Sequence, residues 1–238
     1  MAGKIFLIPT VLGDSSPEKV LPSYVFKVIE RLKHYIVEDL RTARRFIRSA
    51  GSPVPIDDMK FFELNKYTAK EDYLSFLDPV RAGHDTGLLS EAGVPCVADP
   101  GADIVAIAHN LDIKVVPLSG PSSIILALMA SGMNGQGFVF HGYLPVNKAE
   151  RTNAVKKLER DSGINNQSQI FMETPFRNMQ MLDTLTSYCK PPTLLCIACD
   201  ITLETEFIST RSIADWKKNK PDINKRPAIF IIQNSSSR

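Results

Sequence analysis

Short runs of β-branched and aromatic residues alternate with helix-like segments through the first half of this 238-residue chain. We predict strands over 4–8, 35–37, 59–63, 87–89 and 113–117, with helices over 24–32, 39–50, 68–81 and 101–111. Strands and helices in alternation are typical of a mostly parallel sheet that is covered on both faces. The first half of the chain is therefore expected to be an α/β domain.

The pattern restarts after Leu118 with an apolar, helix-like segment over 122–131. From Thr205 onward we expect a strand, a short helix and a strand, which is typical of a mixed sheet. A length of 238 residues is enough for two domains that each have a core of their own. We therefore predict two α/β domains, 1–117 with a mostly parallel sheet and 118–238 with a mixed sheet.

Composition narrows the function classes. The chain has 28 Lys and Arg against 26 Asp and Glu, so contacts with nucleic acid need a local basic cluster. Four cysteines are too few for a disulfide framework, and Cys196 and Cys199 lie in a run typical of a buried strand, so we expect structural thiols and no metal site. The sequence has no signal-peptide pattern and no apolar stretch of about 18 residues, so a cytoplasmic protein without a membrane partner is expected.

Two loops rich in glycine and proline are the best candidates for a ligand site. They span 89–101 and 117–123, and each follows a predicted strand. In open α/β sheets, ligands bind at the carboxyl ends of the strands. Glycine lets a backbone approach a ligand closely, and proline fixes the course of the loop. Plain turn chemistry, with Asp99 and Ser122 as helix caps, stays open as the alternative.

Four segments in a fixed order carry a family resemblance. They are GLLSEAGVPCVADPG (87–101), VVPLSGPSSIILALMASG (115–132), FVFHGYLP (138–145) and IFMETPFR (170–177). In this order they resemble the tetrapyrrole-methylase-like (class III) family of S-adenosylmethionine-dependent methyltransferases. Within that family the chain is most similar to the ribosomal RNA small subunit methyltransferase I group, whose opening motif corresponds to 3–13 and whose E-D-T-R motif corresponds to 38–41.

The resemblance implies a tetrapyrrole methylase fold, in which two α/β domains hold S-adenosylmethionine in the cleft between them. It also implies a homodimer that 2′-O-methylates a ribose of 16S rRNA, with that rRNA or the small ribosomal subunit as substrate. The residues implied to contact the methyl donor are called the donor-binding set below. They are Pro9, Thr10, Leu12, Ser90, Glu91, Ala92, Val94, Pro95, Ser122, Ser123, Tyr143, Leu144, Met172, Pro227 and Ala228.

Three carboxylates are the candidate catalytic residues. A ribose hydroxyl must lose its proton as it attacks the methyl group, and a carboxylate can accept that proton. Glu38 and Asp39 come from the E-D-T-R motif, and Glu173 comes from the last of the four segments. For each of them, a structural ion pair with a nearby arginine is the alternative interpretation.

The segment over 39–50, which we predict to be helical, contains an independent signal for RNA. On this helix, apolar residues fall on one arc and four arginines on the other. The arginines are Arg41, Arg44, Arg45 and Arg48. Such a face can contact a series of phosphate groups. A solvated helix face is the alternative. Arg177, from the last segment, completes the predicted RNA-binding set.

Three functions therefore stay open. The first is methylation of an rRNA ribose. The second is methylation of a tetrapyrrole or another small metabolite, which needs fewer cations than the arginine arc provides. The third is a catalytically silent module that binds the donor or RNA, because Glu91 and Phe176 replace the aspartate and histidine of the family motifs.

Overall fold

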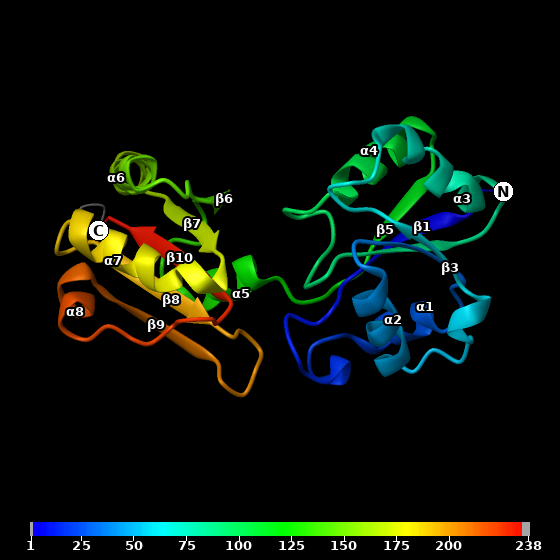
Figure 1. Cartoon of the computed structure of the whole chain (residues 1–238), viewed down its shortest axis with the longest axis horizontal. Coiled ribbons are helices and arrows are strands. Elements are labelled where there is room, and N and C mark those ends of the chain that lie inside the picture. The colour runs from blue at the N-terminus through cyan, green and yellow to red at the C-terminus, as the bar shows by residue number, and fades with distance from the viewer. Residues whose placement is uncertain (1, 235–238) are drawn as a thin grey trace. The chain divides into compact units, whose positions relative to one another are not determined.

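The computed structural model describes residues 2–234, and within them the chain forms two compact units (Figure 1). The first unit ends at Ser122 and the second follows it. We predicted the boundary after Pro117. However, Leu118 donates its backbone N–H to the carbonyl of Leu7 over 3.0 Å. This bond continues the strand pairing and keeps the residues after Pro117 with the first sheet.

The first unit contains a five-stranded parallel sheet with the strand order β3-β2-β4-β1-β5. The strands are β1 (Lys4–Ile8), β2 (His34–Val37), β3 (Lys60–Glu63), β4 (Thr86–Leu89) and β5 (Lys114–Pro117). The parallel sheet predicted for this half of the chain is confirmed. Because all five strands run in the same direction, the loops that follow them leave from one edge of the sheet.

Helices cover both faces of this sheet (Figure 1). They are α1 (Ser23–Ile29), α2 (Leu40–Ser49), α3 (Asp78–Arg81) and α4 (Gly101–Asn110), with short 3-10 segments η1 (Pro17–Lys19), η2 (Ile56–Asp58), η3 (Lys70–Asp72) and η4 (Ser75–Leu77). α1 and α2 bury Ile29 and Ile47 in one hydrophobic cluster, and α3 and α4 bury Val80 and Ile104 in another. The two-sided packing is the arrangement that the alternating pattern predicts.

The single helix predicted over 68–81 is wrong, because η3, η4 and the four-residue α3 occupy this segment instead. Pro79 has no backbone N–H and cannot donate to the carbonyl of Ser75, as a continuous α-helix would require. The apolar residues Phe76, Leu77 and Val80 of this segment are nevertheless buried. The spacing marks the buried face but does not show where the hydrogen-bond ladder is interrupted.

The second unit contains a five-stranded mixed sheet with the order β6-β7-β10-β8-β9, in which β6 and β7 are parallel and the other pairs are antiparallel. The strands are β6 (Phe138–Tyr143), β7 (Ser168–Glu173), β8 (Leu194–Cys199), β9 (Phe207–Ser212) and β10 (Ala228–Gln233). The helices are α5 (Ser123–Ser131), α6 (Lys148–Asn165), α7 (Asn178–Tyr188) and α8 (Ile213–Lys218), with the 3-10 segment η5 (Pro175–Arg177). The predicted mixed sheet is confirmed.

One hydrophobic core joins α6, α7 and α8 to this second sheet, and Trp216 and the stacked rings of Phe171 and Phe230 lie in it. Cys196 and Cys199 are fully buried in β8, in agreement with the predicted strand. Burial raises the pKa of the Cys199 thiol to about 12. No group of His, Cys, Asp and Glu in residues 2–234 could hold a metal ion. Across the same residues, no helix is long and apolar enough to cross a membrane.

Candidate active site

The loops after β1 and β4 are hydrogen-bonded to each other at the edge of the first sheet where its strands end. The backbone N–H of Thr10 donates to the carbonyl of Gly93 over 2.9 Å, and the Thr10 hydroxyl donates to the carbonyl of Ser90 over 3.5 Å. Gly93 has a φ of +74°, and a Cβ there would lie 3.0 Å from both the Leu12 side chain and the Pro121 carbonyl oxygen. The structure thus brings together two loops that both carry members of the donor-binding set. The other members of the donor-binding set on the loop after β4 are Glu91, Ala92, Val94 and Pro95.

The loop after β5 packs against the loop after β1. A Cβ on Gly120 would overlap the ring of Pro9, so only glycine has room at this position. Ser122 and Ser123 follow, where the first unit ends and α5 begins. Three loops therefore present backbone groups, small side chains and hydroxyls at adjoining positions. The residues present fit S-adenosylmethionine, because a folded donor of this kind can be held by backbone hydrogen bonds and close contacts.

A small hollow lies beside the loop after β4. Glu38, Ser90, Asp99 and Gly101 are among the residues that line it. The Asp99 carboxylate accepts hydrogen bonds from the backbone N–H groups of Cys96 and Gly101, both over 2.8 Å. Gly101 is the first residue of α4, so Asp99 accepts one N–H of the first turn, although Pro100 occupies the N-cap position. Asp99 thus orders a turn within the loop that also lines the hollow.

Glu38 follows β2 directly and is half-buried at this edge. Its Oε2 accepts a hydrogen bond from the backbone N–H of Glu91 over 3.2 Å. Burial raises the pKa of the Glu38 carboxyl, and the negative charges of Glu91, Asp99 and Asp39 raise it further, although the Glu91 N–H opposes the change. A carboxylate with a raised pKa is a better proton acceptor than an ordinary one.

Asp39 has a structural role as the N-cap of α2. Its Oδ1 accepts a hydrogen bond from the backbone N–H of Thr42 over 2.7 Å. This bond is the main reason why the pKa of the Asp39 carboxyl is lowered. The contact that defines its position is thus a helix cap, and not the arginine ion pair given as the alternative to catalysis.

Glu173 ends β7 and holds Arg177 in a buried ion pair. Its Oε1 accepts hydrogen bonds from the Thr174 N–H over 2.6 Å and from Nε and Nη2 of Arg177 over 2.9 and 2.5 Å. The side chain of Glu173 is 1% exposed and that of Arg177 is 26% exposed. Within residues 2–234, the buried Oε2 of Glu173 has no hydrogen-bond partner. The structure therefore places Arg177 against a carboxylate, and not on an open basic surface.

The remaining members of the donor-binding set lie together at one end of the second sheet. Tyr143 ends β6 and pairs with Met172 of β7, and Ala228 begins the neighbouring β10 directly after Pro227. Tyr143 is exposed, but Leu144 belongs to the hydrophobic core. Only the backbone of Leu144 is therefore available to a ligand.

Arg151 is a residue whose role sequence reasoning missed. It is an arginine, yet it is 1% exposed. It donates from Nη1 to the Val146 carbonyl over 2.8 Å and from Nε to the Thr184 hydroxyl over 3.2 Å, which ties the loop after β6 to α7. Its spacing from Val155 and Leu158, four and seven residues on, was the available signal, because such residues share one face of a helix.

The arginine arc of α2 faces solvent. Ala43, Phe46 and Ile47 are buried on the other side of the helix, as predicted. The guanidinium of Arg44 lies 5.3 Å from the ring centroid of Phe61 on β3. None of the four arginines forms a salt bridge with a carboxylate of residues 2–234. Below, the term arginine face denotes these four residues, Arg41, Arg44, Arg45 and Arg48.

A family model matches most of the chain. It is described as Tetrapyrrole (Corrin/Porphyrin) Methylases, and it matches residues 18–215. The chain belongs to the tetrapyrrole methylase family. This methylase is similar to the ribosomal RNA small subunit methyltransferase I of Pseudomonas aeruginosa, at 27% identity over 237 residues that cover 97% of this chain and 79% of the relative. The protein of that name from Escherichia coli O157:H7 is 24% identical over 234 residues, which cover 97% of this chain and 78% of the relative.

The fold is similar to that of a solved methyltransferase, CobJ. The TM-score is 0.63 at 16% identity, and the similarity covers 98% of this chain and 95% of that chain. At this identity the similarity supports the tetrapyrrole methylase fold that the motifs predicted. Family membership also confirms the expected enzyme class, a methyltransferase, and the expected methyl donor, S-adenosylmethionine.

Proposed function

We propose that this methylase transfers the methyl group of S-adenosylmethionine to a ribose 2′-hydroxyl of 16S rRNA, either free or in the small ribosomal subunit. The observation that carries the substrate assignment is the arginine face of α2. This face is exposed and forms no salt bridge with a carboxylate of residues 2–234. Both relatives are named as methyltransferases of small-subunit ribosomal RNA, and these names point to the same substrate. By similarity to its family, we also propose that it works as a homodimer in the cytoplasm.

The arginine face has the chemistry that a phosphate backbone requires. Exposed arginines that are not neutralised by carboxylates can each displace a counterion from RNA, which makes binding salt-dependent. Arg44 is held against the Phe61 ring, so less side-chain freedom is lost when its guanidinium binds a phosphate. Cations in a row along one exposed helix suit an extended polyanion, and this favours RNA over a small metabolite.

The donor-binding set supports the methyl-transfer half of the proposal. When bound, S-adenosylmethionine supplies an electrophilic methyl group on a sulfonium sulfur. The protein then has to align the attacking hydroxyl with that methyl group, which is a positioning effect. The loop contacts of Thr10 with Gly93 and of Gly120 with Pro9 hold the first-unit loops in one arrangement, as alignment requires.

Glu38 is the best supported of the three candidate proton acceptors. It is half-buried, its pKa is raised, and it lines the hollow beside the donor-binding loop. The Asp39 carboxylate is engaged in capping α2. Glu173 is engaged with Arg177, although its Oε2 has no partner among the described residues. We therefore propose Glu38 as the group that accepts the ribose proton, and Asp39 as a residue that positions it by capping the helix next to it. Glu173 is assigned a structural role within the second unit, where it holds Arg177.

Two measurements test the proposal. The first is calorimetry with S-adenosylmethionine and S-adenosylhomocysteine, where we expect both to bind. The second is transfer of a labelled methyl group to 16S rRNA and to isolated small subunits, with the modified nucleotide mapped as 2′-O-methyl. Donor binding without methylation of any RNA would refute the rRNA assignment. Failure to bind either ligand would refute the methyl-transfer assignment as well.

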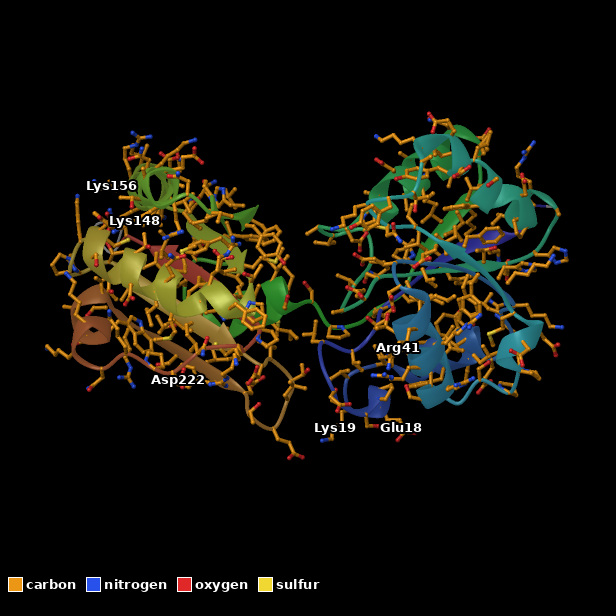
Figure 2. The ribbon with its side chains drawn as sticks, viewed as in Figure 1. Glu18, Lys19, Arg41, Lys148, Lys156 and Asp222 are labelled. Carbon is orange, nitrogen blue, oxygen red and sulfur yellow. The ribbon has the colours of Figure 1, made fainter. Side chains whose placement is uncertain are left out.

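A charge-reversal pair tests the arginine face itself. Arg44→Glu with Arg48→Glu should weaken RNA binding at least tenfold and leave donor affinity unchanged. The slope of log K against log[salt] should also become less steep, because each lost phosphate contact removes about 0.7 from the slope for single strands. Lys148→Glu with Lys157→Glu is the matched control, because it makes the same charge change on exposed positions of α6 (Figure 2 shows Lys148). Equal loss of RNA binding in both double variants would show that only net charge matters.

A further inference from the structure

We propose that the ring of Tyr67 is a stacking platform for an unpaired base of the RNA substrate, beside the arginine face of α2. The inference rests on the proposed function, because it assumes that RNA binds to this unit. It assigns a base-contacting residue to a surface whose arginines we propose as phosphate contacts. The partner is a single-stranded nucleotide, and double-stranded RNA is the alternative that the test excludes.

The exposure of Tyr67 is the first observation. The residue is 82% exposed, the largest value among the large hydrophobic residues within 2–234. Folding gains little from an aromatic ring that stays in water. Tyrosine combines a large flat surface with few rotatable bonds, so an exposed ring of this kind is well suited to binding.

The turn that carries Tyr67 is ordered by side-chain hydrogen bonds. Asn65 Oδ1 accepts from the Tyr67 N–H over 2.9 Å, and the Asn65 N–H donates to the Thr68 hydroxyl over 2.9 Å. The Thr68 hydroxyl in turn donates over 3.0 Å to the carbonyl of Glu63, the last residue of β3. The backbone under the ring is thus fixed before RNA arrives, which lowers the entropy lost on binding.

The position of this turn places it next to the start of α2. β2 and β3 are parallel neighbours, with Val37 opposite Glu63, and the Leu64 N–H donates to the Val37 carbonyl over 2.8 Å. α2 begins just after β2, and the Tyr67 turn comes just after β3, so both leave the same edge of the sheet from adjacent strands. Arg41 lies at the start of α2 (Figure 2) and is the member of the arginine face nearest this edge in the chain.

A lysine lies beside the proposed platform. The Lys66 Nζ lies 4.9 Å from the ring centroid of Tyr67. Proteins that hold single strands combine a cationic groove for the backbone with aromatic rings on which bases stack. A base inside a duplex has both faces covered by its neighbours, so it cannot stack on the ring. The combination of Tyr67, Lys66 and the arginine face therefore fits an unpaired nucleotide and its flanking phosphates.

The experiment compares binding of a labelled single-stranded RNA and a duplex of the same length by fluorescence anisotropy. Tyr67→Ala should raise the Kd for the single strand about tenfold, which lies within the range measured for base–aromatic stacking. Its Kd for the duplex and for S-adenosylmethionine should not change. Tyr67→Phe should bind the single strand as the unmodified protein does, because the ring is kept. The salt slope of Tyr67→Ala should also stay the same, because no phosphate contact is lost.

Tyr188 provides a matched control. It is 40% exposed at the end of α7 in the second unit, and the Lys156 Nζ lies 5.3 Å from its ring centroid. It is therefore also a tyrosine next to a lysine, but it is not part of the unit that carries the arginine face (Figure 2 shows Lys156). Tyr188→Ala should leave the Kd for the single strand unchanged.

Three results would overturn the inference while RNA binding by the unmodified protein stands. Tyr67→Ala could bind the single strand as tightly as the unmodified protein, Tyr67→Phe could weaken binding as much as Tyr67→Ala, or binding of the duplex could fall equally. An unmodified protein that binds S-adenosylmethionine and no RNA would instead overturn the proposed function. The two failures are therefore distinguishable.

Discussion

Replacing Arg177 should destabilise the second unit more than replacing its partner, Glu173. The asymmetry follows from burial, because the Glu173 side chain is 1% exposed and the Arg177 side chain is 26% exposed. Arg177→Met removes two of the three hydrogen bonds to Oε1 and leaves a buried carboxylate with only the Thr174 N–H. Leaving one partner of a buried ion pair uncompensated typically costs about 3–5 kcal/mol.

Glu173→Gln should lower the free energy of unfolding by about 1–2 kcal/mol. The amide oxygen can still accept from Thr174 and Arg177, so the change replaces charge-assisted hydrogen bonds by weaker ones. The amide nitrogen can take the place of Oε2, which has no partner in the described residues. Arg177, about a quarter exposed, regains part of its hydration. The double variant Arg177→Met/Glu173→Gln should be milder than Arg177→Met alone, because it leaves no buried charge.

Trp216 allows unfolding of the second unit to be followed by fluorescence. It is the single tryptophan of the chain, it is 1% exposed, and its Nε1 donates to the Leu195 carbonyl over 2.9 Å in the core of the second unit. Its fluorescence during urea unfolding therefore reports on the unit that contains the ion pair. The reasoning is refuted if Glu173→Gln costs as much as Arg177→Met, or if the two changes add in the double variant. A stable Glu173→Gln protein without methyl transfer would instead show that Glu173 accepts the ribose proton.

Three further predictions concern the first unit. Asp39→Ala should lower the free energy of unfolding by about 1 kcal/mol in circular-dichroism melts. Asp39→Ser should restore it, because serine can also accept from the Thr42 N–H. Loss of methyl transfer in Asp39→Ser would show a role beyond capping. Because the raised pKa of Glu38 means that folding favours its protonated form, its contribution to stability is present at low pH and is lost as pH rises through that pKa. Glu38→Gln should therefore raise the melting temperature at pH 7 and change it little at pH 4, while methyl transfer is lost; equal shifts at both pH values would contradict this. Gly120→Ala should clash with the Pro9 ring, cost about 1–3 kcal/mol and weaken donor binding in calorimetry, and an unchanged donor affinity would show that this contact does not shape the site.

Local patterns predicted the elements that depend on periodic burial. The apolar arc of α2 is buried and its arginines are exposed, as the spacing of Ala43, Phe46 and Ile47 indicates. The strand pattern likewise separated a parallel sheet in the first unit from a mixed sheet in the second. The Asp39 cap was also available from the sequence, since an aspartate directly before a helical pattern is a common helix start. Such features can be predicted because each depends on residues a few positions apart.

Interactions between distant parts of the chain could not be predicted in this way. Pairing of Glu173 with Arg177 could have been inferred from their separation of four residues, but its burial depends on how the second unit packs. Arg151 looked like a surface cation and is instead a buried donor to the loop after β6. The exposure of Tyr67 was not predicted, although its polar neighbours in the sequence are typical of a surface turn.

The sequence by itself determined the family, the two kinds of sheet and the basic face of one helix. Only the tertiary structure decided which polar groups meet. The hydroxyl of Thr10 reaches the carbonyl of Ser90, 80 residues away in the chain, because β1 and β4 are parallel neighbours and their loops leave the same edge of the sheet. It also decided which of the three candidate catalytic carboxylates has a raised pKa, since Glu38 becomes half-buried beside Glu91 and Asp99 only when the sheet has formed. Burial and charge proximity are properties of the packed sheet, and the order of residues does not contain them.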